Sequence, residues 1–78
     1  MTLAEADIGQ QLVVTGFSDE HVWLKGLRFG LSVGAVVVPV IRYPWGGPTV
    51  IELAQQRLAL GHSVCRAITV APRQGSRC

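Results

Sequence analysis

The apolar residues of this chain fall into short runs, rich in valine and isoleucine, that glycines and prolines interrupt. β-branched residues favour strands, and glycine and proline commonly mark the points where an element ends. The pattern predicts five short strands, at 11–17, 35–43, 49–53, 57–60 and 67–70. Together with one helix, described below, the order along the chain is one strand, one helix and four further strands.

The run 35–43 (AVVVPVIRY) is the most strongly β-branched part of the chain. Its residues are apolar at consecutive positions, which is typical of a strand that is covered on both faces. Pro39 cannot donate a ladder hydrogen bond, so we expect a sheet edge or a bulge at that point. The segment 44–48 contains two glycines and joins this run to 49–53, and together the three segments predict a β-hairpin.

One α-helix is predicted over about 19–29. Ser18 or Asp19 can accept hydrogen bonds from the free amide groups of its first turn. The negative charges of Asp19 and Glu20 suit the positive end of the helix dipole. Gly30 stands where many helices end in a left-handed residue.

The helix is also predicted to have two different faces. Lys25 and Arg28 suit the negative end of the helix dipole, and on the outer face they could steer an acidic partner. Four apolar residues recur at three- and four-residue spacing, namely Trp23, Leu24, Leu27 and Leu31. This stripe is expected to dock on the sheet, with Leu31 folding back on Leu27.

Five short strands in so small a chain are most economically arranged as a closed sheet, because closure removes the exposed edges that invite aggregation. The sequence therefore predicts a mainly β fold, a small SH3-like barrel of about five short strands with one inserted α-helix. We expect a single domain over residues 1–70. Residues 71–78 (APRQGSRC) have no hydrophobic pattern and are expected to form a flexible tail. Any open strand edge could support weak self-association.

Composition and charge narrow the class of protein. The chain has 78 residues, of which 49% are hydrophobic and 15% charged, with a formal net charge of +2. Its basic residues are spread singly, unlike the clustered basic surface of a nucleic-acid-binding protein. High hydrophobicity with low net charge also excludes an intrinsically disordered chain.

The sequence predicts a cytoplasmic protein with no direct membrane insertion. Residues 1–10 carry no lysine or arginine and lack the apolar region of a secretory signal. The longest apolar stretch, 33–41, is far shorter than the roughly 20 residues of a membrane-spanning helix. In a reducing compartment, Cys65 and Cys78 are expected to remain thiols.

Catalysis is not expected. His62, Ser63 and Cys65 are the one cluster of catalytic residue types, and an imidazole can take a thiol proton and stabilise the thiolate. These residues lie on a tight turn, however, in a chain too small to build a deep cleft. A free cysteine more commonly serves as a small buried apolar residue.

Two groups of residues could ligate a metal ion. Asp19, Glu20 and His21 lie at the start of the predicted helix. His62 and Cys65 lie near the end of the chain. A stable site takes three or four converging ligands, and neither group has the paired spacing of a structural zinc motif. We therefore expect no required cofactor, and at most weak Fe²⁺ or Zn²⁺ binding unless the fold joins the two groups.

Trp45 lies at the tip of the predicted hairpin, between a proline and two glycines. Tryptophan and tyrosine are enriched at interface hot spots, so an exposed Trp45 would form a recognition surface with Tyr43. Alternatively, the ring folds back over the barrel mouth, since large aromatic side chains are highly buried on average. The predicted partner-binding residues are Tyr43, Pro44, Trp45, Gly46, Lys25 and Arg28.

Several segments, taken in order, resemble one known family. The helix end LRFGLSVGA at 27–35 precedes a β-branched strand and the motif YPWGGP at 43–48. The opening 2–10, with TLA and IGQ, and the closing segments RLAL at 57–60 and RAITV at 66–70 complete the series. Over residues 2–70 and without an insertion, the series resembles the FeoA family, called ferrous iron transport protein A.

The resemblance implies an SH3-like barrel and an accessory role in bacterial ferrous iron uptake. The implied partner is the large membrane permease that carries a cytosolic GTPase domain (FeoB), which could recruit the chain to the inner face of the membrane. The alternative is a sensor or carrier of Fe²⁺ or Zn²⁺ in the same uptake system. A third possibility is a relative of the SH3-like domain of metal-dependent repressors, which the short length and the start at Met1 disfavour.

The chain departs from the family pattern at two positions. The family usually has an acidic residue where Gly47 stands, and often a glutamate near the position of Val64. Any role of those acidic residues in the family is therefore not transferred to this chain.

Overall fold

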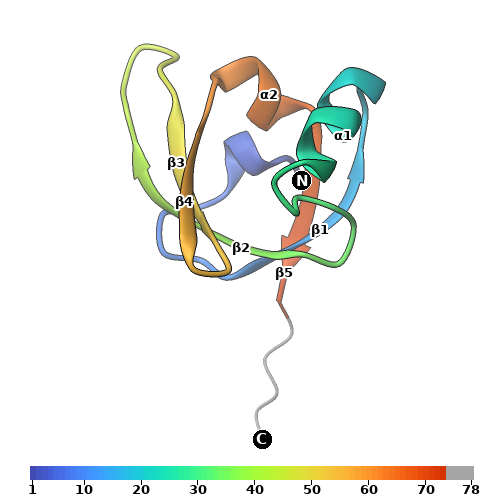
Figure 1. Ribbon diagram of the computed structural model, residues 1–78. Helices are drawn as coiled ribbons and strands as arrows, with labels where there is room; N and C mark the ends of the chain where they lie inside the picture. Colours follow the sequence, from blue (N-terminus) through green and yellow to red (C-terminus); the bar gives the residue numbers. More distant parts are fainter. Residues whose placement is uncertain (74–78) are drawn as a thin grey trace, which may run out of the picture.

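A computed structural model of the chain describes residues 1–73. The strands are β1 (Leu12–Phe17), β2 (Val36–Arg42), β3 (Thr49–Leu53), β4 (Gln56–Leu60) and β5 (Ile68–Pro72). The helical elements are the short 3₁₀ turn η1 (Leu3–Glu5) and the helices α1 (Glu20–Leu27) and α2 (His62–Arg66). All five predicted strands form, and the expectation of a mainly β fold is confirmed (Figure 1).

The five strands form one antiparallel sheet in the order β4-β3-β2-β1-β5. The sheet curls around the interior of the molecule, and α2 connects β4 to β5 (Figure 1). In the part of the chain that the structure describes, β4 and β5 do not pair with each other. The barrel is therefore open on this side, where closure of the sheet was expected.

The two edge strands differ in how their outer edges are covered. The Val70 amide of β5 donates to the Met1 carbonyl at 2.8 Å, and Thr2 forms an isolated β-bridge with Thr69. Within residues 1–73, β4 pairs only with β3. The start of the chain thus protects β5, whereas the outer edge of β4 lacks a partner strand.

Pro39 lies at a bulge in β2, as its missing amide proton predicted. The pairing register of β2 and β3 shifts between Pro39 and Ile41. The expectation that β2 is covered on both faces is wrong, because Val37 and Pro39 are buried while the alternate residues are half-buried or exposed. A sheet in a chain of this length has one apolar interior, and no second layer covers its outer face.

The core lies on the inner face of the curled sheet and draws on nearly every element. Its fully or almost fully buried members are Leu3, Ala6, Leu12, Val14, Leu31, Val37, Ile51, Leu53, Cys65, Ile68 and Val70. Alternation along each strand sends every second side chain into this interior. η1 and α2 add Leu3 and Cys65 at the side of the barrel that the strands leave open.

Helix α1 begins and ends much as predicted. The Asp19 carboxylate caps it by accepting a hydrogen bond from the His21 amide at 2.8 Å. After the last turn, Gly30 has a φ of 81°, in the left-handed region that glycine adopts without a steric penalty. The Leu31 amide then donates back to the Gly26 carbonyl at 2.8 Å, which is the long hydrogen bond of a Schellman motif.

The predicted docking face of α1 is wrong. Trp23, Leu24 and Leu27 are 41%, 49% and 48% exposed, and only Leu31 of the expected stripe enters the core. The buried residue of the helix is Gly26, whose backbone lies against Leu31. Val22, one turn before Gly26, is the side chain of α1 that packs against the core, so most of the apolar surface of the helix faces outward.

Two further expectations about the C-terminal part need correction. The segment read as a tight turn at His62 and Cys65 is the short helix α2, so the chain has a second helix. Ala71 and Pro72 belong to β5, and the Arg73 amide donates to the Gln11 carbonyl at 2.9 Å. The domain therefore extends beyond residue 70. The rest of the predicted tail, 74–78, lies outside the described residues.

Candidate functional site

The turn between β2 and β3 presents a fully exposed tryptophan. Trp45 is 98% exposed and has a φ of 64°, a left-handed conformation that a bulky residue rarely adopts. Gly46 follows with a φ of 73°. Of the two arrangements that the sequence left open, the exposed one is confirmed, and Trp45 does not cover the barrel.

The rest of this turn is held by its own backbone. The Tyr43 amide donates to the Pro48 carbonyl at 3.1 Å, and the Gly47 amide donates to the Pro44 carbonyl at 3.2 Å. A Cβ added at Gly47 would lie 3.0 Å from the Cβ of Tyr43, so the turn is tightly folded below its tip. Tyr43 is 49% exposed. The turn thus presents two aromatic side chains on a compact support.

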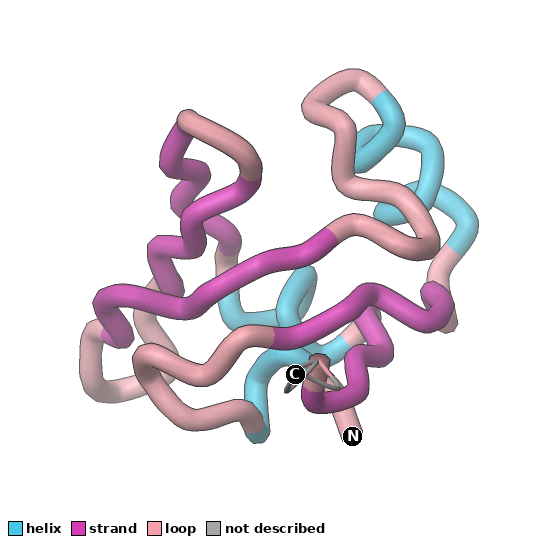
Figure 2. The backbone as a smooth tube through the Cα atoms, turned by 90° about the horizontal axis from the view of Figure 1, so that it is seen from below, coloured by secondary structure: helices cyan, strands magenta, loops and turns pink. Residues whose placement is uncertain are grey.

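Lys25 and Arg28, the other predicted partner-binding residues, are exposed on and just after α1. The chain leaves α1, enters β2 at one end and reaches the Tyr43 to Pro48 turn only at the other end. Figures 1 and 2 show α1 and this turn on opposite sides of the molecule. The predicted surface is therefore two separate surfaces.

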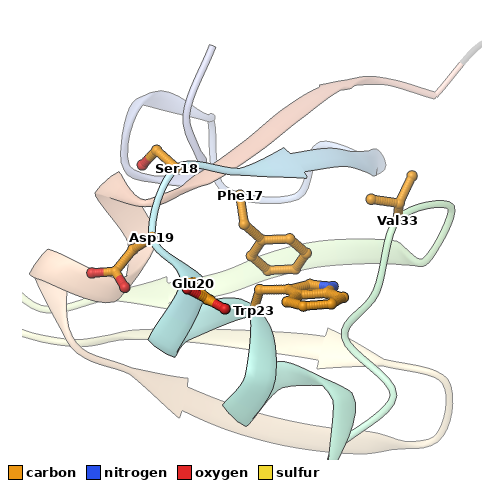
Figure 3. Close-up of a pocket in the computed structure, with 6 residues that line it drawn as sticks. All are labelled: Phe17, Ser18, Asp19, Glu20, Trp23 and Val33. Atoms are coloured by element: carbon orange, nitrogen blue, oxygen red, sulfur yellow. The ribbon is translucent and has the colours of Figure 1, made fainter.

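Beside α1, the outward-facing apolar side chains line a shallow hollow of about 410 Å³. Its apolar side consists of Phe17, Trp23 and Val33, and the rings of Phe17 and Trp23 face each other (Figure 3). The side chains of Ser18 and Asp19 point away from the two rings (Figure 3). The hollow is a surface feature, formed because α1 turns its tryptophan toward the end of β1 and away from the core.

The candidate metal ligands do not assemble. The Asp19 carboxylate is engaged in capping α1, and His62 is exposed at the start of α2. Across residues 1–73, no group of three or more His, Cys, Asp or Glu side chains lies close enough to hold a metal ion. The fold therefore does not join the helix-start group to His62 and Cys65 in the way a shared site requires.

Cys65 is a core residue. Its side chain is fully buried, and its Sγ lies 3.7 Å from the Leu60 carbonyl oxygen. Burial raises the pKa of the Cys65 thiol, which disfavours the nucleophilic thiolate. The interpretation of Cys65 as a small buried apolar residue is confirmed, whereas a catalytic pair of His62 and Cys65 lacks both an accessible thiol and a reactive thiolate.

Sequence reasoning missed the surface around α1. No binding role was predicted for Phe17, Phe29 or Val33, although Phe29 is 50% exposed and Val33 is 62% exposed. Their positions depend on how α1 packs, and the helical spacing of Trp23 and Leu27 pointed to a different inward face. Gly26 was the available indication of this packing. A glycine inside a helix lowers stability, so its presence indicates that another part of the chain comes too close for a side chain.

None of the helices in the described part of the chain is long and apolar enough to span a membrane.

Comparison with solved structures shows the same fold in several proteins. FeoA from Chlorobium tepidum superimposes with a TM-score of 0.85 at 24% identity, over 99% of this chain and 74% of that one. FeoA from Stenotrophomonas maltophilia, solved in complex with zinc and described as a prokaryotic SH3 domain protein, gives 0.78 at 26% identity over 91% and 89%. The expected SH3-like architecture is thereby confirmed.

The fold also occurs as part of larger proteins. A manganese-dependent transcriptional repressor matches with a TM-score of 0.84 at 19% identity, over 94% of this chain but 41% of its own length. No protein of curated function matches the sequence. The model of the FeoA domain, however, matches residues 1–72. With nearly the whole described chain matched, this protein belongs to the FeoA family, which is associated with ferrous iron transport.

Proposed function

We propose that this chain is a non-catalytic accessory module of ferrous iron uptake that docks on the GTPase-linked ferrous iron permease (FeoB) at the cytosolic face of the membrane. Family membership supplies the link to ferrous iron transport. A module without chemistry of its own acts by contact, so the exposed surfaces of the fold are the features that would meet the permease.

The observation that carries the proposal is the exposure of Trp45. The almost fully exposed indole places a large apolar surface in water. Tryptophan is among the residues that contribute most to binding when an interface buries them. Its left-handed backbone adds a cost of about 1–2 kcal/mol for a residue with a side chain. Both costs are offset where a partner buries the ring. We assign the contact to Tyr43, Pro44, Trp45 and Gly46.

Lys25 and Arg28 would meet a different part of the partner, because α1, which carries Lys25 and ends next to Arg28, lies on the other side of the molecule from the turn (Figures 1 and 2). The turn is therefore the primary contact in this proposal.

The experiment is a titration of isotope-labelled protein with the purified cytosolic GTPase domain of the permease, followed in amide spectra. Shifts at Tyr43 to Pro48 that disappear in Trp45→Ala support the proposal. Leu24→Ala is the control, because it removes a half-exposed apolar side chain from α1 and leaves the turn intact. Loss of binding in Leu24→Ala with retention in Trp45→Ala would move the contact to the helix.

A transition metal ion is the second candidate ligand, because the Stenotrophomonas maltophilia relative was solved with zinc. In this chain Asp19, Glu20 and His21 supply ligand types, but residues 1–73 contain no converging group of three. Binding of Fe²⁺ or Zn²⁺ is therefore expected to be weak. Anaerobic titration checks this expectation, since stoichiometric Fe²⁺ binding would favour a sensor or carrier over a docking module.

A further inference from the structure

A second hollow lies on the other side of α1, between this helix and the corner where β4 leads into α2. It is an apolar groove of about 160 Å³. Its apolar walls are formed by Val22, Phe29, Leu31, Leu58, Leu60 and Val64. We call this feature the α1–β4 groove.

The groove exists because of how α1 is docked. Gly26 is part of its lining and has no side chain to fill it, and the backbone of the helix rests on Leu31. Leu58, Leu60 and Val64 pack against the core from the far side and are only partly buried. The space between the two walls is therefore built by three separate elements and does not depend on a single flexible loop.

The size of the groove fits one apolar side chain. An apolar cavity of about 150 Å³ takes up a molecule as large as benzene. A leucine or methionine side chain is of similar size. The α1–β4 groove therefore provides a pocket for one anchoring side chain, and a larger apolar body such as an amphipathic helix would lie mostly outside it.

The charge of the groove favours particular residues on either side of the anchoring side chain. The polar side chains of the lining are Lys25 and His21, and no carboxylate is part of it. In the described residues the one ion pair joins Arg57 to Glu52, so Lys25 has no acidic partner. Arg28 adds a second exposed cation one helical turn further along. An unpaired cation beside an apolar pocket complements a segment in which an apolar residue stands among acidic ones.

We propose that the α1–β4 groove binds an acidic segment of a partner protein through one leucine or methionine side chain, with Lys25 pairing with a neighbouring carboxylate. The neighbouring edge of β4 suits an extended segment, because it has no strand partner in residues 1–73. The inference rests on the proposed function only in treating the chain as an interaction module. Binding of the permease through Trp45 and binding of a peptide in the groove are measured separately.

The experiment uses the full chain with ¹³C-labelled leucine and valine methyl groups. The probe is a nine-residue peptide with one central leucine and two aspartates on each side of it. Saturable shifts at the methyl groups of Val22, Leu58, Leu60 and Val64 are expected. A peptide with serine in place of the leucine, and one with lysines in place of the aspartates, should both bind at least about tenfold more weakly.

Two variants test the geometry independently. Lys25→Glu reverses the charge at the groove without touching the core, and we expect about 5- to 10-fold weaker peptide binding. Arg66→Glu is the matched control, because it makes the same change of net charge on an exposed residue outside the groove. Val64→Phe should fill the pocket and abolish the methyl shifts. If Val64→Phe fails to fold, the weaker binding expected for Lys25→Glu still tests the proposal.

Three results would overturn the proposal. The first is the absence of groove shifts at millimolar peptide. The second is a concentration dependence of the same methyl signals without peptide, which would assign the groove to a second copy of the chain. The third is a response of these methyl groups to anionic phosphatidylglycerol vesicles but not to the peptide, which would assign it to a membrane surface.

Discussion

Gly26 lies so close to Leu31 that the helix has no room for a side chain at this position. A Cβ built on Gly26 would lie 2.7 Å from the Leu31 carbonyl oxygen, a distance that real Cβ contacts essentially never show. The Gly26 carbonyl in turn accepts the Leu31 amide at 2.8 Å. The backbone of α1 is thus held directly against the chain that follows it, and Leu31 anchors this end of the helix in the core.

Gly26→Ala should therefore destabilise the fold. In an unconstrained helix the change from glycine to alanine is favourable by about 0.5–1 kcal/mol. Here the clash is with backbone, which cannot rotate away, and forced overpacking costs about 1–3 kcal/mol. We expect a lower free energy of unfolding in urea denaturation, together with shifts of the Leu31 amide signal.

Gly61→Ala serves as the control for this substitution. Gly61 precedes α2 with a φ of −62°, and a Cβ there would meet no atom within 4 Å. The free energy of unfolding should change by less than about 0.5 kcal/mol in this variant. Equal effects of the two substitutions would show that the contact of Gly26 with Leu31 is not what holds α1.

Arg42 joins the β2–β3 hairpin to the start of the chain. Its guanidinium donates to the Ala6 carbonyl at 2.6 Å, to the Leu3 carbonyl at 3.1 Å and to the Thr49 hydroxyl at 3.3 Å. In Arg42→Ala the carbonyl of the buried residue Ala6 loses this partner, whereas the Leu3 carbonyl keeps its hydrogen bond from the Ala6 amide at 3.3 Å. An unsatisfied buried group costs about 1–3 kcal/mol. We expect a loss of that order in denaturation, with faster amide hydrogen exchange in η1.

The control for Arg42→Ala is Arg57→Ala. Arg57 pairs with Glu52 at 3.0 Å, but both side chains are well exposed, at 62% and 44%. Exposed ion pairs contribute about 0–1 kcal/mol. Arg42→Lys should remain destabilised, because a single ammonium group cannot reproduce the fork of donors that reaches two carbonyls. A loss in Arg57→Ala equal to that in Arg42→Ala would contradict this assignment.

Strand positions were predictable from the sequence because β-branched runs and their glycine and proline boundaries are local properties. The bulge at Pro39 was predictable for the same reason, since the missing amide proton acts within the strand itself. The Asp19 cap and the left-handed Gly30 likewise depend on adjacent residues. Each of these features follows from the chemistry of a few neighbouring positions.

The packing of α1 was not predictable in this way. Trp23 and Leu27 have the spacing of a core-facing stripe, but the face of α1 that meets the core is the neighbouring one, which carries Val22 and Gly26. Spacing describes which side chains share a face, and not which face meets the sheet. The α1–β4 groove could not be foreseen either, because it requires Leu58 and Val64 to come together with a helix some 35 residues away in the sequence.

The stability of the protein should depend on the protonation of Cys65. Burial raises the pKa of this thiol in the folded state, so the folded protein keeps a proton that the unfolded chain releases above its ordinary pKa of about 8.5. The stabilising contribution is full below that pH, and it is lost as the pH rises toward the raised folded pKa. We expect the free energy of unfolding to fall with pH in this alkaline range.

The measurement compares the parent chain with Cys65→Ala, both with Cys78→Ser to remove the second thiol. Other groups titrate in the same range, so the informative quantity is the difference in free energy of unfolding between the two proteins. This difference should be constant below about pH 8 and change in favour of Cys65→Ala at higher pH. A difference that does not vary with pH would show that the Cys65 thiol titrates as it does in the unfolded chain.

Trp45 and Ala54 are the two non-glycine residues of the described chain with a positive φ, 64° and 57°. A left-handed conformation costs a residue with a Cβ about 1–2 kcal/mol. Glycine avoids that cost but loses about 0.5–1 kcal/mol through the greater freedom of the unfolded chain. Trp45→Gly and Ala54→Gly should therefore each leave the free energy of unfolding unchanged or raise it by up to about 1.5 kcal/mol. Only Trp45→Gly should weaken binding of the permease GTPase domain, because Ala54 is in the β3–β4 turn and carries no large side chain. Strong destabilisation by Trp45→Gly alone would show that the indole supports the fold, and its exposure could then no longer be attributed to a partner.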